Sequence, residues 1–288
     1  MKSANCWGIY REQAHSPGRE SDDARILEAT SRALASTGYL LELKTPEAAV
    51  ADLDQAPPRI LLMCERGPIL ERLRHLERAG CVQINAPEAV LNTYRCAMIK
   101  RLRGAGIPIP RSAIVATASG VAQPPGLADA LWVKRGDVHN TRDGDGDVTL
   151  VHSRGDMQAA LGVFAARGIE HAIIQDHTPG DLIKFYGVGD LSRVPNQTPW
   201  FRWFYHRDQT LGRYPFEPAA LAAVVQRAAA ALGLEIYGGD AIVTPAARLF
   251  LIDINAWPSF ALYRDEGATY IADYVSARFA SARLSRPG

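Results

Sequence analysis

The first 84 residues alternate short apolar runs with amphipathic segments of helical spacing. Apolar runs of strand length occupy residues 6–10, 39–43, 59–64 and 82–84. Between them, apolar residues recur at helical spacing after Ser21 and after Ile69, and the two segments end at Gly38 and Gly80. Strands that alternate with helices favour a parallel sheet covered by helices. We therefore expect an N-terminal α/β lobe over residues 1–84.

The following segment has the pattern of one long helix and a proline-rich exit. Pro87 suits a first helical position, and the helical pattern continues to about Arg103. Residues 104–106 (GAG) end the helix, and residues 107–110 (IPIP) hold the chain extended. A turn at AQPPG marks a lobe boundary, so residues 85–128 are expected to connect two lobes.

From residue 129 the pattern changes to short strands around one or two helices. This predicts a small α+β lobe over residues 129–190, with strands at 131–134, 148–151, 171–175 and 182–188 and a helix at 155–167. A second lobe is expected over residues 191–288, with an irregular segment at 193–214, helices at 218–232 and 266–280, and strands at 237–243 and 249–255. The predicted fold class is therefore α/β and α+β.

Composition narrows the class of function. The chain has 288 residues, 47% of them hydrophobic, and a formal net charge of +1. So small a charge gives no electrostatic reason to expect nucleic acid or an anionic membrane as a partner. The four cysteines form no CxxC pair and no apolar run approaches the length of a membrane span. We expect a soluble, cytoplasmic protein that acts on a small molecule, and the pattern leaves a homodimer open.

Two neighbouring strands near the C-terminus carry oxygen-bearing side chains. Asp253 and Asn255 alternate on one strand, so they point to the same face, and Asp240 lies on the strand before it. Magnesium prefers such hard oxygen ligands, with phosphates and water completing its shell. Carboxylates within an apolar strand are costly unless they are paired or bound to metal. The alternative is that Asp253 and Asn255 simply end the strand at the surface.

Two further segments suit a nucleotide. Lys134 ends an apolar strand before a glycine-bearing loop, so its ammonium group could reach phosphate oxygens while loop amides cover them. Residues 173–177 (IIQDH) run from an apolar strand into a polar hinge that suits adenine, with a carboxylate to reach the ribose. Each segment alone also fits a structure without a binding role: Lys134 could be a solvated lysine at the end of a strand, and residues 173–177 could run into an ordinary polar turn.

The order of these segments resembles the ATP-grasp superfamily, over roughly residues 85–280. The resemblance implies an ATP-grasp fold preceded by an α/β lobe, with ATP and magnesium as cofactors, or manganese in its place. Arg95 takes the position of the family's first ATP-binding lysine and Lys134 that of the second. The implied nucleotide contacts are Arg95, Lys134, Gln175, Asp176, His177 and Asp181. The implied metal ligands are Asp240, Asp253 and Asn255.

Two branches of the superfamily resemble the chain. Carboxylate–amine ligases of the glutathione-synthetase and glutamate-ligase type usually have glutamate where this chain has Asp253. The Asp-x-Asn spacing is similar to that of the inositol polyphosphate kinases, as is Lys134 followed by His139. In those kinases the residues matching His139 and Lys184 lie near the phosphoryl acceptor.

The charge pattern bears on the choice between these branches. The loop at 135–147 is rich in aspartate and is expected to be solvated, which disfavours a polyphosphate substrate. Arg202, within the aromatic run 200–205, could bind a carboxylate or phosphate of the acceptor, or the run could be a hydrophobic flap. We favour a ligase that acts through an acyl phosphate, with a small-molecule kinase as the alternative and a nucleotide-binding module without turnover as a third hypothesis.

Overall fold

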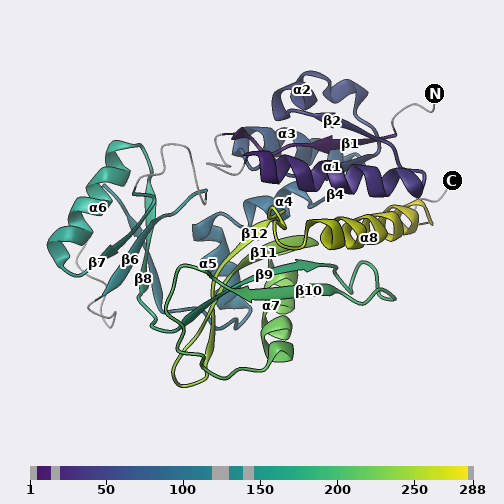
Figure 1. The fold of residues 1–288 in the computed structure, drawn as a ribbon. Helices are drawn as coiled ribbons and strands as arrows, with labels where there is room; N and C mark the ends of the chain where they lie inside the picture. Colours follow the sequence, from purple (N-terminus) through teal and green to yellow (C-terminus); the bar gives the residue numbers. More distant parts are fainter. Residues whose placement is uncertain (1–4, 14–19, 119–129, 139–145, 285–288) are drawn as a thin grey trace.

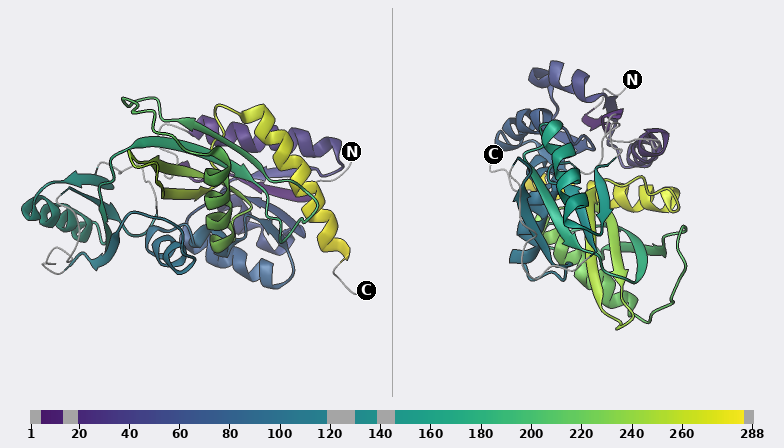
Figure 2. Two further views of the ribbon diagram at one scale, coloured as in Figure 1. Left: turned by 90° about the horizontal axis from the view of Figure 1, so that it is seen from below. Right: turned by 90° about the vertical axis from the view of Figure 1, so that its left-hand side faces the viewer.

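Three four-stranded β-sheets form three lobes of the molecule (Figure 1). The computed structural model describes residues 5–13, 20–118, 130–138 and 146–284. The N-terminal lobe lies above the largest lobe in Figure 1, and the small lobe with helix α6 projects at one end, away from both chain termini (Figures 1 and 2). The mixed α/β and α+β class predicted from the sequence is confirmed.

The N-terminal lobe is a parallel sheet in the order β2-β1-β3-β4. Its elements are β1 (Cys6–Ile9), α1 (Glu20–Ser36), β2 (Leu41–Lys44), α2 (Pro46–Ala51), the 3-10 turn η2 (Leu53–Gln55), β3 (Arg59–Leu62), α3 (Gly67–Arg78) and β4 (Val82–Ile84). The predicted parallel arrangement is confirmed. Each strand is short, and the central strands β1 and β3 are buried, as expected of a parallel sheet with helices on its faces.

The connecting segment contains two helices, α4 (Pro87–Leu91) and α5 (Arg95–Gly104), so the prediction of one continuous helix is wrong. Residues 92–94 form a turn between the two helices, and two of their side chains bond to distant carbonyls. Asn92 donates through Nδ2 to the carbonyl of Leu232, and the hydroxyl of Tyr94 donates to the carbonyl of Glu65. This break creates a helix N-terminus at Arg95, whose first amides donate to carbonyls of the small lobe instead of to the preceding turn.

The small lobe is an antiparallel sheet in the order β5-β8-β6-β7, covered by α6. Its elements are β5 (Ser112–Ala116), β6 (Leu131–Arg135), β7 (Val148–Val151), α6 (Arg154–Ala166) and β8 (His171–Asp176). A separate apolar core, with Val133, Leu161 and Phe164 at its centre, holds α6 against the sheet. Strand β5 comes from the segment that the sequence assigned to the connection, so the connection contributes an edge strand to this lobe.

The large lobe is an antiparallel sheet in the order β10-β9-β11-β12. Its elements are β9 (Asp181–Val188), β10 (Trp200–Tyr205), α7 (Pro218–Leu232), β11 (Ile236–Val243), β12 (Leu249–Ala256) and α8 (Arg264–Leu284). Apolar residues of α7 pack on one face of this sheet, and α8 packs between the other face and the N-terminal lobe. The remainder of that second face is open and forms the floor of the site.

Two predictions about this lobe are corrected by the strand pairing. The strand at 182–188 was assigned to the small lobe, but β9 pairs with β10 and β11, so the boundary between the lobes lies before Asp181. Residues 200–205 were expected to be irregular, yet they form the edge strand β10. The run WFRWFY lacks a polar–apolar alternation because aromatic rings pack on both faces of this strand.

Asn85 joins the N-terminal lobe to the large sheet. Its side-chain oxygen accepts from the amides of Glu235 and Ile236 at 2.7 and 2.9 Å, and its Nδ2 donates to the carbonyl of Ile236 at 2.7 Å. The residue is fully buried, so these bonds satisfy an amide that would otherwise be costly to bury. The start of β11 is therefore fixed to the lobe above it.

Two smaller expectations concern the cysteines and the membrane. The four cysteines are free thiols, as the sequence predicted. No helix in the described part of the chain combines the length and apolarity needed to cross a bilayer.

Candidate functional site

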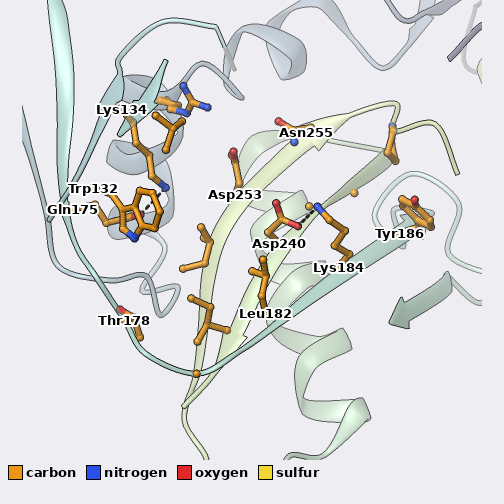
Figure 3. A pocket seen from close by; sticks show the side chains of 18 of the residues that line it. Trp132, Lys134, Gln175, Thr178, Leu182, Lys184, Tyr186, Asp240, Asp253 and Asn255 are labelled. Carbon is orange, nitrogen blue, oxygen red and sulfur yellow. Dashed lines mark hydrogen bonds and ion pairs between the residues drawn. The ribbon is translucent and has the colours of Figure 1, made fainter. Parts of the chain in front are cut away.

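A cavity of about 920 Å³ lies where the three lobes meet (Figure 3). The small lobe contributes side chains of β6 and β8, and the large lobe contributes side chains of β9, β11 and β12. Arg95, at the start of α5, and Arg11, Asp23 and Glu65 of the N-terminal lobe complete its lining. Residues from all parts of the chain therefore converge on one cavity.

The small-lobe wall presents a buried lysine held by a chain of hydrogen bonds. Lys134 Nζ donates to Gln175 Oε1 at 2.8 Å, and Gln175 Nε2 donates to Ser112 Oγ at 3.0 Å. The bond to Ser112 fixes which end of the Gln175 amide faces the lysine. Lys134 is only 8% exposed, and burial lowers its pKa to about 8, although Asp253 partly offsets that effect.

Arg95 adds a second buried cation beside Lys134. Its guanidinium donates to the carbonyls of Arg135 and Val138, both at 3.4 Å, and burial lowers its pKa, with partial compensation from Asp253 and Asp147. The backbone amides of Arg95 and Cys96 donate to the carbonyls of Asp137 and Gly136, so the N-terminus of α5 anchors the start of the loop that follows β6. The two cations suit a triphosphate, whose charge would offset their loss of hydration.

The large-lobe wall presents two carboxylates on adjacent strands. Asp240 of β11 lies directly opposite Asp253 of β12, and a bulge follows in the register, so that Ala241 pairs with Leu251 and Ile252 is skipped. The bulge lets Ile252 and Asp253, neighbours in sequence, both face the cavity. A Cβ at Gly239 would stand 2.1 Å from the carbonyl oxygen of Asp253, so only glycine allows this close approach.

Asn255 and Lys184 complete this wall (Figure 3). The side-chain oxygen of Asn255 is buried and has no hydrogen-bond partner in the part of the chain that the structure describes. Lys184 Nζ lies 2.8 Å from Asp240 Oδ1, on the strand opposite in register. A buried acceptor without a partner is costly, so the orphaned oxygen of Asn255 indicates a ligand in the cavity.

The oxygen donors of this wall suit a magnesium ion that is shared with phosphate oxygens better than a metal ion bound by protein side chains alone. Asp240, Asp253 and Asn255 offer oxygen atoms from one face of one hairpin. Within the described ranges, no group of three His, Cys, Asp or Glu side chains gathers at metal-binding distance. Magnesium typically takes one or two carboxylates and completes its shell with water and substrate phosphates. The structure thus brings the three predicted ligands to the cavity, and their role as metal ligands stays a prediction.

Apolar side chains form a slot at the hinge between the small and large lobes. Trp132 of β6 faces Leu182 of β9 across the cavity (Figure 3). Ile242, opposite Leu182 in the strand register, and Ile252 also line the cavity. The indole Nε1 of Trp132 donates to His177 Nδ1 at 3.2 Å. A planar, mostly apolar slot next to buried cations is suited to a purine base joined to phosphates.

The N-terminal lobe closes the opposite end of the cavity with charged residues. The guanidinium of Arg11 contacts Asp23 and Glu65, both at 3.1 Å, and also donates to the carbonyls of Ala256 and Trp257 at 2.8 and 2.7 Å. Arg11 therefore clamps the end of β12, directly after Asn255, to the N-terminal lobe. With two carboxylates and one guanidinium, these three residues give this end of the cavity one net negative charge.

Three predicted site residues are not placed in the cavity. Asp181 was expected to contact the nucleotide, but it is 1% exposed and accepts from the amides of Gly212 and Tyr214 at 2.7 and 3.0 Å, so it anchors a loop instead. Arg202 lies on the edge strand and is ion-paired with Glu266. His139 lies outside the described residues.

The two ends of the acidic loop are ion-paired. Arg135 contacts Asp137 near the start of the loop and both oxygens of Asp147 at its end, the latter at 3.3 Å. Arg167 adds a contact to Asp147 at 2.7 Å. The expectation of a solvated loop is therefore wrong for Asp147, which is buried against Arg135 and Arg167. The Asp137 side chain is 43% exposed, and Asp143 and Asp145 lie outside the described residues.

Several lining residues were not identified from the sequence. Trp132 and Tyr186 each stand two positions from a residue that was identified, Lys134 and Lys184, so strand alternation could have revealed them. Arg11, Asp23 and Glu65 carry no such signal, because they come from a lobe whose position over the cavity depends on long-range packing.

Comparison with known proteins identifies the fold. No family model matches the chain, and no curated protein matches its sequence. Among solved structures, the D-alanine-D-alanine ligase from Coxiella burnetii is similar with a TM-score of 0.68 and 12% identity over 98% of this chain and 97% of that chain. A RimK domain ATP-grasp protein from Sphaerobacter thermophilus is similar with a TM-score of 0.65 and 17% identity over 94% of this chain and 99% of that chain. The two sheets that face each other across the cavity, preceded by a parallel α/β lobe, are thus those of the ATP-grasp fold.

Proposed function

We propose that this protein binds ATP with magnesium in the cavity and forms an amide bond between a carboxylate and an amine. The observation that carries the proposal is the opposition of charge across the cavity. Buried cations, Lys134 and Arg95, face the oxygen donors Asp240, Asp253 and Asn255. A magnesium–triphosphate complex placed between them would satisfy both walls at once.

Each residue has a defined task in this proposal. Lys134 and Arg95 bind phosphate oxygens, and the slot beside Trp132 takes the adenine, with Asp176 within the same cavity for the ribose. Asp240, Asp253 and Asn255 would hold magnesium, which when bound offsets the charge that develops on the transferred phosphoryl group. The start of the loop after β6 is anchored to the N-terminus of α5, next to Arg95.

The reaction proceeds in two steps. A carboxylate oxygen of the first substrate attacks the γ-phosphorus of ATP, the bond from that phosphorus to the bridging oxygen breaks, and ADP leaves. The amine of the second substrate then attacks the acyl carbon, phosphate leaves with the electrons of the carbon–oxygen bond, and the amine loses a proton. Excluding water matters most between these steps, because the acyl phosphate hydrolyses readily.

The charge of the cavity supports an amine acceptor over a polyphosphate. Five carboxylates and four cationic side chains line it among the described residues. Cations that could have formed a denser basic pocket are paired elsewhere, Arg202 with Glu266 and Arg193 with Asp190. A polyphosphate acceptor would require an excess of cations, whereas this lining has one carboxylate more than its cations, which favours an amine. The likeness to a D-alanine-D-alanine ligase adds support at the level of the fold.

The test is a mass balance with the purified protein. ATP, magnesium and a pool of amino acids and small carboxylic acids are incubated, and free phosphate and product masses are followed. A ligase releases one phosphate for each product whose mass equals the two substrates minus water. A kinase releases no phosphate and adds one phosphoryl mass to a single metabolite, and this outcome, or no turnover in any pool, would overturn the proposal.

A further inference from the structure

A second cavity, of about 490 Å³, lies on the far side of the segment that leads into the small lobe. Its walls come from the end of α5, the extended residues 107–112 and the turn before β12. Arg103, Arg111 and Arg248 line it together with Pro108, Pro110 and Phe250. We call this cavity the arginine groove.

The arginine groove gathers positive charge without matching negative charge. No carboxylate lines it among the described residues. Arg103 donates to the carbonyl of Ser112 at 2.7 Å, and Arg111 lies 3.5 Å from Asp176 with 64% of its side chain exposed, so that this pair is weak. Each guanidinium has five N–H donors, so most donors remain available to an anion.

The groove is also shaped in advance. The guanidinium of Arg248 stacks 4.9 Å from the centre of the Phe250 ring, which limits its orientations. Pro108 and Pro110 stiffen the opposite wall, and the amide of Leu251 donates to the carbonyl of Pro108 at 2.8 Å, which ties that wall to β12. The three cations that line the groove repel each other, and a bound anion relieves that repulsion.

The groove touches the hinge of the nucleotide cavity without opening into it. Ser112, whose carbonyl accepts from Arg103, also accepts through Oγ from Gln175, which in turn accepts from Lys134. Arg111 contacts Asp176, which lines the nucleotide cavity. Arg248 belongs to the large lobe and Arg111 leads into the small lobe, so one ligand in the groove would contact both lobes.

We propose that the arginine groove binds a small phosphate-bearing molecule, through bidentate contacts of Arg111 and Arg248 to phosphate oxygens. The apolar surface of Phe250 and the two prolines contacts the remainder of that molecule. This inference stands apart from the proposed ligase activity, because it concerns different residues and needs no turnover.

Pyrophosphate, titrated calorimetrically without magnesium, is the probe. It can bind in the nucleotide cavity as well, so the titration is made in the Lys134→Met variant, which weakens that site. We expect binding to persist in Lys134→Met, and to weaken tenfold or more when Arg248→Gln or Arg111→Gln is added. Arg32→Gln, an exposed arginine on α1 in another lobe, is the matched control and should leave the affinity unchanged.

Two outcomes would overturn the proposal. One is that Lys134→Met shows no residual binding of pyrophosphate. The other is that residual binding is the same with and without Arg248→Gln and Arg111→Gln. Thermal melting of each variant shows whether it is folded, and because these arginines are exposed we expect melting temperatures close to that of the parent protein. If the parent protein shows no ATP turnover, both binding results can still be interpreted, because neither depends on catalysis.

Discussion

The two walls of the nucleotide cavity are both antiparallel sheets, yet they carry their charges in opposite ways. The small-lobe side presents cations that are less than a tenth exposed, Lys134 and Arg95. The large-lobe side presents carboxylates that stay partly hydrated, with 27% of the Asp240 side chain exposed. Desolvated cations gain most from a bound anion, whereas partly exposed carboxylates can exchange water for a metal at little cost. Neither wall is complete alone, and a metal–phosphate ligand completes both.

The largest effect is expected on the large-lobe wall, which carries the carboxylates and is called the carboxylate wall below; the small-lobe side with Lys134 and Arg95 is called the cationic wall. Asp253→Ala removes a proposed magnesium ligand, and ATP turnover should fall about 1,000-fold, which corresponds to the several kcal/mol that a metal contributes to transition-state stabilisation. Phosphate release measures the effect. Asp54→Ala, an exposed aspartate of the N-terminal lobe, is the control and should behave like the parent protein. Equal turnover in both variants would remove Asp253 from the site.

A second effect is expected on the cationic wall. Lys134→Met should raise the Kd for ATP roughly 50-fold, from the ~1.5–3 kcal/mol that a hydrogen bond to a charged group contributes. The pKa of Lys134 is about 8, so in the parent protein ATP affinity should also decline as pH rises through 8. Fluorescence titration at pH 7 and pH 9 measures both effects. Parallel pH profiles for parent and variant would contradict the assignment.

The lowered pKa of Lys134 also predicts how the free energy of unfolding of the ligand-free protein depends on pH. This pKa is lowered from the ordinary 10.5 to about 8 in the folded protein. Between these values the unfolded chain binds a proton that the folded chain has lost, so the free energy of unfolding should rise with pH there. Lys134→Met should lack this rise. Denaturant unfolding of both proteins at pH 8 and pH 10 gives the comparison.

A third variant tests whether the bulge positions the carboxylate wall. Gly239→Ala places a Cβ against the carbonyl of Asp253 and 2.8 Å from the ring of Phe185, so the two strands must shift apart. We expect a loss of stability of about 2 kcal/mol, typical of overpacking, together with a higher magnesium requirement for turnover. Gly162→Ala is the control, because nothing lies within 4 Å of its Cβ. An unchanged magnesium requirement would show that the bulge does not set the metal site.

The smallest effect is expected behind the cationic wall. Ser112→Ala removes the acceptor of the Gln175 amide, so Gln175 loses the bond that keeps its oxygen toward Lys134. The KM for ATP should rise about threefold, the size of one neutral hydrogen bond, while kcat at saturating ATP stays the same. A change in kcat alone would mean that Ser112 acts on a different step.

Local pattern alone predicted much of the cavity. The positions of Lys134, Asp253 and Asn255 followed from polar residues at the ends of apolar strands, where burial demands a partner. Strand alternation placed Asp253 and Asn255 on one face, and helical spacing predicted the N-terminal lobe, because both are properties of neighbouring residues. Motif order added the ATP-grasp fold, which the comparison of structures bears out.

Only the tertiary structure decided which strands pair and which residues therefore share a face. Periodicity could not show that β9 joins the large sheet, that a bulge at Ile252 turns Asp253 toward the cavity, or that Arg11 clamps the end of β12. It also could not remove Asp181 from the site, because the amides that bind its carboxylate lie about thirty residues away. Each of these depends on contacts between distant segments, whose geometry follows from how the whole core packs and leaves no mark in the local spacing of residues.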